Sequence, residues 1–336
     1  MAESIRSEAT PLAVVPLSPM VSVSGVRVLS DSGRIITAEM SVQQWLALPD
    51  HPRQRDTERH ARARHWQFAK RATGAAFQHL THVTAACWDG TLYKVNGHTR
   101  ALLWVRGELP SPEHLHVTIY KVTTRDELND LYVAFDPAWA AKPEYEKVYG
   151  GLRECGLNLK SPRLKRGFLA DSFNIALRGL TRLHQDKRKL EPLDMYKAVA
   201  VFKNELELLD SVNPQKEVFQ AGVLAAALIT LSLYPDGLEF WRKLALKEGN
   251  KQDGLVDPVE IVLTQIDKLK RDRASWTNTQ QELLCGRALA AFLAWEKGRH
   301  GKSGQYWFKT TVHAVDLQPL IAQMKAKKGI LHDPDL

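Results

Sequence analysis

The first third of the chain contains short β-rich runs separated by turn residues, whereas the second half has apolar residues at helical spacing. The runs predict strands near Val21–Leu29, Arg34–Glu39, His82–Trp88, Thr91–Val95 and Leu115–Val122. Helical periodicity in the second half predicts helices over Asp194–Leu209, Lys216–Leu233, Gly237–Lys247, Val259–Leu269 and Asn278–Lys297. The pattern therefore predicts an α+β domain followed by an all-α helical domain.

Local start and stop signals sharpen these predictions. Ser41 followed by Gln44 fits a capping box that opens a short helix. Asp89-Gly90 predicts a hairpin turn, and Thr124 followed by Glu127 caps a helix that runs to about Phe135. We place a flexible arm at residues 1–20, the α+β domain at 21–155 and the helical domain at 160–330.

Composition narrows the class of protein. Lys and Arg number 46 against 38 Asp and Glu, a formal charge of +8, which favours polyanionic partners such as nucleic acid or nucleotides. The most apolar window, Ala221–Leu233, spans 13 residues, and a membrane span needs about 20. The N-terminus lacks the layout of a signal peptide, and the 3 cysteines show neither disulfide nor zinc spacing. We expect a cytoplasmic protein with no membrane partner and no bound metal of its own.

The stretch from Asp89 to Ala101 carries the most specific signal. A hairpin strand ends at Gly97, and a helix over His98–Arg106 follows directly with Arg100 in its first turn. The first N–H groups of a helix have no intrahelical partner, and the helix dipole is positive there. Glycine permits close approach of a phosphate, and arginine can bind it through two hydrogen bonds. This arrangement predicts an anion site.

The strand, Gly-x-x-Arg box and helix resemble the ParB/sulfiredoxin superfamily. About 40 residues upstream, the segment from Leu48 to Arg55 (LPDHPRQR) resembles that family's first box, Asn-Pro-x-Gln-Pro-Arg. The order of strands, boxes and helices matches over residues 20–135. The resemblance implies a ParB/sulfiredoxin-like fold that holds nucleotide phosphates at the glycine box.

The boxes also depart from the family. His98 occupies the position of the sulfiredoxin cysteine, which argues against sulfinic-acid reduction. Chromosome-partition ParB proteins carry two adjacent arginines, and here Thr99 precedes the single Arg100. We identify no clear helix-turn-helix after residue 160. The resemblance therefore implies phosphate binding but does not specify a reaction.

Candidate site residues follow from the boxes and from the basic run after them. Phosphate or nucleotide contacts are assigned to Asn96, Gly97, His98, Thr99, Arg100, Arg53 and Arg55. DNA contacts are assigned to Arg59, Arg62 and Arg64, and proton transfer to His98 or Glu39. A nucleoside triphosphate with Mg²⁺ is the expected cofactor, with Glu39 as a candidate carboxylate for the metal or for activating a hydroxyl.

Ordinary structural explanations stand beside these assignments. The Asn-Gly turn can simply connect a strand to a surface helix, the basic run can be a solvated face, and Glu39 can be a surface carboxylate. The basic segments Lys268–Arg273 and Lys325–Lys328 of the helical domain could face DNA, and the tail His332–Asp335 is expected to fray.

Three functions remain open. The preferred one is a ParB-like nucleotide- and DNA-binding protein of phage or plasmid origin. The second is an enzyme of the same fold, either a nuclease or a nucleotide-dependent kinase. The third is a non-catalytic adaptor in which the helical domain serves oligomerisation, including self-association.

Overall fold

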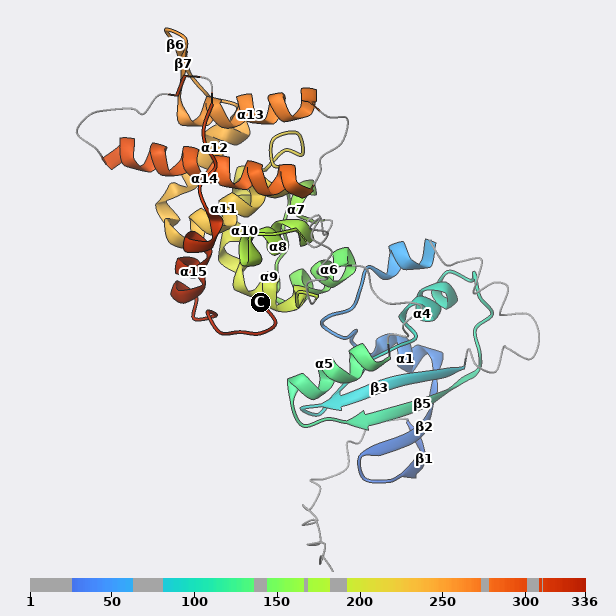
Figure 1. Cartoon of the computed structure of the whole chain (residues 1–336). Coiled ribbons are helices and arrows are strands. Elements are labelled where there is room, and N and C mark those ends of the chain that lie inside the picture. Colours follow the sequence, from blue (N-terminus) through green and yellow to red (C-terminus); the bar gives the residue numbers. More distant parts are fainter. Residues whose placement is uncertain are drawn as a thin grey trace, which may run out of the picture. The chain divides into compact units, whose positions relative to one another are not determined.

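A computed structural model describes residues 26–62, 81–135, 144–165, 169–181, 192–272, 278–300, 308–309 and 311–336. The chain divides into two compact units (Figure 1). The first comprises the described parts of residues 1–51 and 57–135, and the second those of 52–56 and 136–336. The division thus falls after Phe135, ahead of the boundary expected near 155, and it assigns residues 52–56 to the second unit. The expected N-terminal arm lies outside the described residues.

The first unit is built on a mixed five-stranded sheet in the order β1-β2-β5-β3-β4. Its strands are β1 Arg27–Asp31, β2 Ile35–Ser41, β3 His82–Trp88, β4 Thr91–Lys94 and β5 His114–Lys121. All neighbouring strands are antiparallel except β3 and β5, which are parallel. The predicted mixture of strands and helices is therefore present in this unit.

Three helices of this unit begin where the sequence predicted. The helix α1, Val42–Ala47, has the complete capping box between Ser41 and Gln44. The helix α4, His98–Val105, follows Gly97, and α5, Arg125–Ala134, is capped by the Thr124 side chain. The predicted turn at Asp89-Gly90 is also confirmed, with both residues at positive φ.

The two faces of the sheet are covered by different helices. Alternate residues such as Ala38, Met40 and Val83 point to one face, where they pack with Trp45 of α1 and Trp104 of α4. On the opposite face Ala86 packs against Leu128 and Tyr132 of α5. The start of α4 is therefore fixed on the face that holds the larger core.

The described residues of the second unit form helices and one two-stranded ribbon, β6 Lys251–Gln252 with β7 Leu255–Val256. Its helices are α6 Glu144–Glu154, α7 Pro162–Lys165, α8 Ala170–Arg178, α9 Met195–Val201, α10 Lys203–Val212, α11 Ala221–Leu233, the 3₁₀ turn η2 Pro235–Gly237, α12 Leu238–Leu246, α13 Pro258–Asp272, α14 Asn278–His300 and α15 Leu317–Lys327. The single helix predicted over Asp194–Leu209 is wrong, because it is interrupted at Phe202 between α9 and α10. The Phe202 ring is fully buried and stacks on Phe173, so tertiary packing outweighs the helical periodicity there.

The helix α11 is the centre of this unit, as its Ala-rich sequence predicted. Eleven of its residues are buried, and it packs against α8, α10, α14 and α15. Phe240 and Trp241 of α12 contact Phe292 of α14 in an aromatic cluster beside it.

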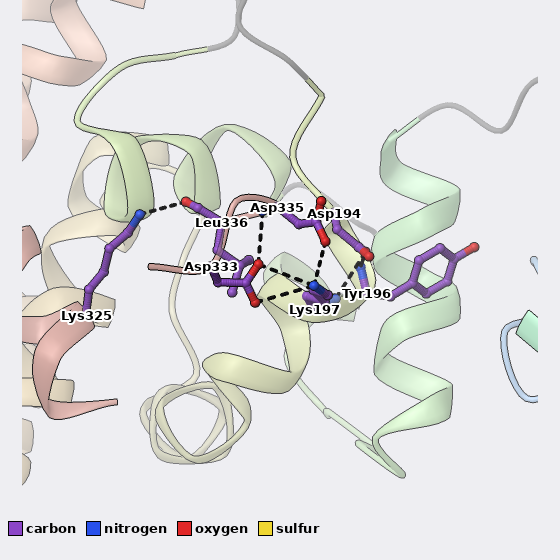
Figure 2. A network of polar contacts seen from close by, with 7 residues as sticks. All are labelled: Asp194, Tyr196, Lys197, Lys325, Asp333, Asp335 and Leu336. Carbon is purple, nitrogen blue, oxygen red and sulfur yellow. Dashed lines mark hydrogen bonds and ion pairs between the residues drawn. The ribbon is translucent and has the colours of Figure 1, made fainter. Parts of the chain in front are cut away.

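The C-terminal tail is bound to the second unit, so the expectation of a frayed tail is wrong (Figure 2). Lys197 of α9 pairs with Asp333 at 3.3 Å and with Asp335 at 2.6 Å. Lys325 donates a hydrogen bond to the Leu336 carbonyl oxygen at 2.7 Å, and the Leu336 side chain is buried. These contacts give the last residues fixed partners.

The three lysines of the segment 325–328 all bind groups of the second unit itself. Lys327 donates to the Leu233 carbonyl oxygen at 3.0 Å, and Lys328 pairs with the buried Glu205 at 2.9 Å. With Lys325 bound to Leu336, this segment does not offer the basic loop that the sequence suggested.

Candidate functional site

The start of α4 is set by Gly97. Its backbone adopts φ 79° and ψ −2°, a left-handed conformation that favours glycine. A Cβ at this position would lie 2.8 Å from Val83 Cγ1 and 3.5 Å from Trp45 Cζ2. Glycine is therefore required here both by the backbone angle and by the close packing of β3 and α1.

The first turn of α4 is electrostatically positive. No side chain caps this helix, and its first turn contains no acidic residue. The first N–H groups and the positive end of the helix dipole are therefore not compensated by an acidic residue of the helix itself. Such a helix start can bind an anion.

Asp50, Lys94 and His98 form a compact polar cluster beside this helix start. A parallel bridge joins Asp50 to Lys94, since His51 N donates to the Lys94 carbonyl oxygen and Lys94 N donates to that of Pro49. The Asp50 Oδ1 atom then lies 3.1 Å from Lys94 Nζ and 3.0 Å from His98 Nδ1. Strand β4 thus places a carboxylate from the first box against the histidine of the second.

The cluster shifts the pKa values of two of its members. Burial raises the pKa of Asp50, but the hydrogen bond and charge of His98 and the charge of Lys94 outweigh it, so the pKa lies well below its usual range. Burial lowers the pKa of His98, and the Lys94 charge lowers it further, against the opposing contacts with Asp50 and the Val95 backbone. Asp50 is therefore ionised and His98 neutral at pH 7.

Two buried nitrogen atoms next to the helix start have no hydrogen-bond partner among the described residues. They are His98 Nε2 and Trp45 Nε1, and their side chains are 8% and 0% exposed. A buried polar atom without a hydrogen-bond partner destabilises the folded state. A bound ligand that supplies the partner would remove this cost. Sequence reasoning did not identify Trp45, Asp50 or Lys94 as site residues.

The other residues of the glycine box have separate partners. Asn96 accepts a hydrogen bond from Thr84 N at 2.9 Å and donates one to Thr84 Oγ1 at 3.1 Å, so it orients the loop. Thr99 Oγ1 lies 2.9 Å from His60 Nδ1. Arg100 Nη1 donates to the His82 carbonyl oxygen at 2.7 Å, and burial lowers the pKa of Arg100 to about 10, so it remains charged at pH 7.

Glu39, the candidate carboxylate, lies elsewhere. Its neighbours Ala38 and Met40 point into the core that α1 and α4 cover, so Glu39 lies on the opposite face of the sheet. There it pairs with Arg27 at 3.2 Å. The structure therefore does not bring Glu39 to His98, and Asp50 is the carboxylate that contacts this histidine.

Arg53 and Arg55 belong to the second unit, where they pair with carboxylates of α6. Arg53 Nε lies 2.6 Å from Glu154 Oε2, and Arg55 Nη1 lies 3.2 Å from Glu146 Oε2. These pairs are mostly buried. Both guanidinium groups thus have carboxylate partners in a unit that does not contain the glycine box, and we do not include them in the phosphate site.

The basic run is only partly within the described residues. Residues 57–62 are helical, with Arg59 and Arg62 exposed, and Arg62 pairs with Glu58 at 3.2 Å. Arg64 lies outside the described part of the chain. Two of the three arginines assigned to DNA are therefore on an exposed helical surface.

Comparison of the chain with protein-family models, with curated proteins and with solved structures finds no match. Within the described ranges, no three His, Cys, Asp or Glu side chains are gathered closely enough to hold a metal ion. In the same ranges no helix is long and apolar enough to cross a membrane.

Proposed function

We propose that the first unit binds the phosphate of a nucleotide at the start of α4, and that the protein is a ParB-like nucleotide- and DNA-binding protein of phage or plasmid type. The observation that carries the proposal is the uncapped start of α4, led by Gly97 at φ 79° with Arg100 in its first turn. These are the features that permit close approach of a phosphate and stabilise its charge.

The order of the elements supports the ParB/sulfiredoxin resemblance. The first box, residues 48–55, follows β2 and α1, and the glycine box lies between β4 and α4, with β5 next. The bridge between Asp50 and Lys94 gives the two boxes a direct connection. An accidental Asn-Gly turn would not require the upstream box to pair with the strand that leads into it.

The DNA part of the proposal depends on charge. The chain carries a formal charge of +8, and Arg59 and Arg62 expose their side chains on one helical turn. The affinity for DNA falls as the salt concentration rises. Each arginine that neutralises a DNA phosphate makes the slope of log K against log salt concentration more negative by about 0.9. Changing both arginines to alanine is expected to reduce that slope by about 2.

The nucleotide site is tested by calorimetric titration of the four ribonucleoside triphosphates, with and without Mg²⁺. We expect at least one to bind, and Arg100→Ala to weaken it by about tenfold or more, because a charge-assisted hydrogen bond is lost. Arg34→Ala is the matched control, since Arg34 is an exposed cation beside the turn between β1 and β2. No heat with any triphosphate, or equal losses in both variants, would contradict the proposal.

A second candidate function is phosphoryl transfer, in which the protein acts as a nucleotide-dependent enzyme. The contact between Asp50 and His98 favours it, because a carboxylate that orients a neutral histidine is a common arrangement for a general base. Phosphorus NMR of the protein with a triphosphate would follow the release of diphosphate. Activity that His98→Ala abolishes and Arg34→Ala retains would support this candidate, whereas an unchanged triphosphate spectrum would exclude hydrolysis.

A further inference from the structure

We infer that His98 offers its ligand a hydrogen-bond acceptor and no donor, so that the site takes a phosphorylated ligand with a hydroxyl group beside the phosphate. The inference rests on the proposed phosphate site and specifies its ligand class as a ribonucleotide in preference to a nucleotide without ribose hydroxyls. Asp50 and Lys94 hold the His98 ring in the neutral form that has its proton on Nδ1.

The position of the imidazole proton follows from the partner of Nδ1. This nitrogen lies 3.0 Å from Asp50 Oδ1, and an ionised carboxylate can only accept hydrogen bonds. Nδ1 must therefore carry the proton. In a neutral imidazole only one nitrogen is protonated, so Nε2 presents a lone pair.

The surroundings favour the neutral ring. His98 is 8% exposed, and the charge of Asp50 is already balanced by Lys94 Nζ at 3.1 Å. A second cation on the ring would be buried next to that of Lys94. Asp50 and Lys94 thus form an ion pair with no net charge. This pair orients the His98 ring but does not favour a second proton on Nε2.

A bare Nε2 is a poor partner for phosphate. Phosphate oxygens are acceptors, and two acceptors do not form a hydrogen bond with each other. Phosphate contacts are therefore left to the N–H groups of the first turn and to Arg100. The lone pair of His98 requires an O–H or N–H group, which a ribose hydroxyl supplies.

The tautomer can be tested directly in the free protein. A long-range ¹H–¹⁵N spectrum of the histidine side chains, with His98 assigned through the His98→Ala variant, is expected to show Nδ1 protonated and Nε2 bare at pH 7. A proton on Nε2, or on both nitrogens, would overturn the inference whatever the protein binds.

The ligand class is tested with the best-binding ribonucleoside triphosphate and its 2′,3′-dideoxy form. The dideoxy form is expected to bind about tenfold or more weakly, because it leaves the buried acceptor without a partner. In His98→Ala the two forms should bind within about threefold of each other, whereas His114→Ala, which changes a histidine that is 61% exposed, should retain the preference.

The outcomes separate this inference from the proposed function. Equal binding of the two forms to the wild-type protein would overturn the hydroxyl preference and leave the phosphate site standing. If none of the four ribonucleoside triphosphates bound to the wild-type protein, the phosphate site itself would be refuted. A preference that survives in His98→Ala would show that another residue recognises the hydroxyl, and would overturn the assignment to His98.

Discussion

Arg53 donates a hydrogen bond to Glu154 across 101 positions of the sequence, with 2.6 Å between Nε and Oε2 and with 17% and 13% of the two side chains exposed. The guanidinium group also lies over the ring of Tyr196, 4.3 Å from its centroid. This pair holds the segment 52–56 on α6 and α9. It gives an arginine of the first box a structural role in the second unit.

Arg53→Met is expected to lower the free energy of unfolding of the second unit by about 2–3 kcal/mol, because it leaves the carboxylate of Glu154 buried with one partner fewer. Arg242→Met is the control, since Arg242 pairs with Glu239 at 2.7 Å but the two side chains are 48% and 43% exposed. Such an exposed pair is screened by solvent, so its loss should lower the free energy of unfolding much less than the loss of Arg53. Urea denaturation measures both values, and equal losses would contradict the role of burial.

Arg53 shows which kinds of contact can be predicted from the sequence and which cannot. Capping residues, the Asp89-Gly90 turn and the glycine before α4 act on their immediate neighbours, so their effects could be predicted. The partner of a charged side chain is chosen by tertiary structure. Nothing near Arg53 in the sequence indicates that a carboxylate 101 residues away would bind it.

Asp50 illustrates the same limit within the candidate site. It lies in the box that the sequence singled out, but its function depends on Lys94 and His98, which β4 brings next to it. Glu39 was instead the carboxylate that the sequence favoured, since it follows a strand and precedes a helix. Only the alternation of the sheet, which turns Glu39 away from the face with α4, separates the two carboxylates.

Gly97 and Gly90 provide a matched pair for testing the packing at the start of α4. Both have positive φ, 79° and 74°, but a Cβ at Gly90 would meet nothing within 4 Å, whereas one at Gly97 would lie 2.8 Å from Val83 Cγ1. Each change to alanine should cost about 1 kcal/mol or more for the backbone angle. Gly97→Ala should cost at least about 1 kcal/mol beyond that, as measured by denaturation, because Val83 must move. Equal losses would show that Val83 yields without cost.

Gly222 lies where the backbones of α11 and α14 pack closely together. A Cβ there would overlap the Gln281 carbonyl oxygen, and Gly222 N donates to the Gln281 side chain at 2.8 Å. Gly222→Ala is expected to destabilise the second unit by about 3 kcal/mol or more, since two helix backbones must separate. Gly254→Ala, where the added Cβ meets nothing within 4 Å, should cost about 1 kcal/mol for its positive φ. A small loss for Gly222→Ala in thermal or urea unfolding would contradict the packing of α11 on α14.

The buried His98 predicts a pH dependence of stability. Burial holds the pKa of His98 in the folded protein below its ordinary value of 6.5. Below pH 6.5 the unfolded chain therefore binds more protons at this residue than the folded one, and the free energy of unfolding falls as the pH drops toward the folded pKa. One proton limits the contribution to about 1.4 kcal/mol per pH unit. Asp50 acts in a separate window, because its pKa is lowered from 3.8 and its contribution is lost only as the pH falls below that value.

Urea denaturation of the wild type and His98→Gln at several pH values between 7 and 5 isolates the histidine. The glutamine variant should show a smaller slope of unfolding free energy against pH, since its side chain does not titrate. His114→Gln removes an exposed histidine and should retain the wild-type slope. If His98→Gln and the wild type had the same slope, His98 would not be held neutral by burial in the folded state. The inference that Nε2 is unprotonated and accepts a hydrogen bond would then fail as well.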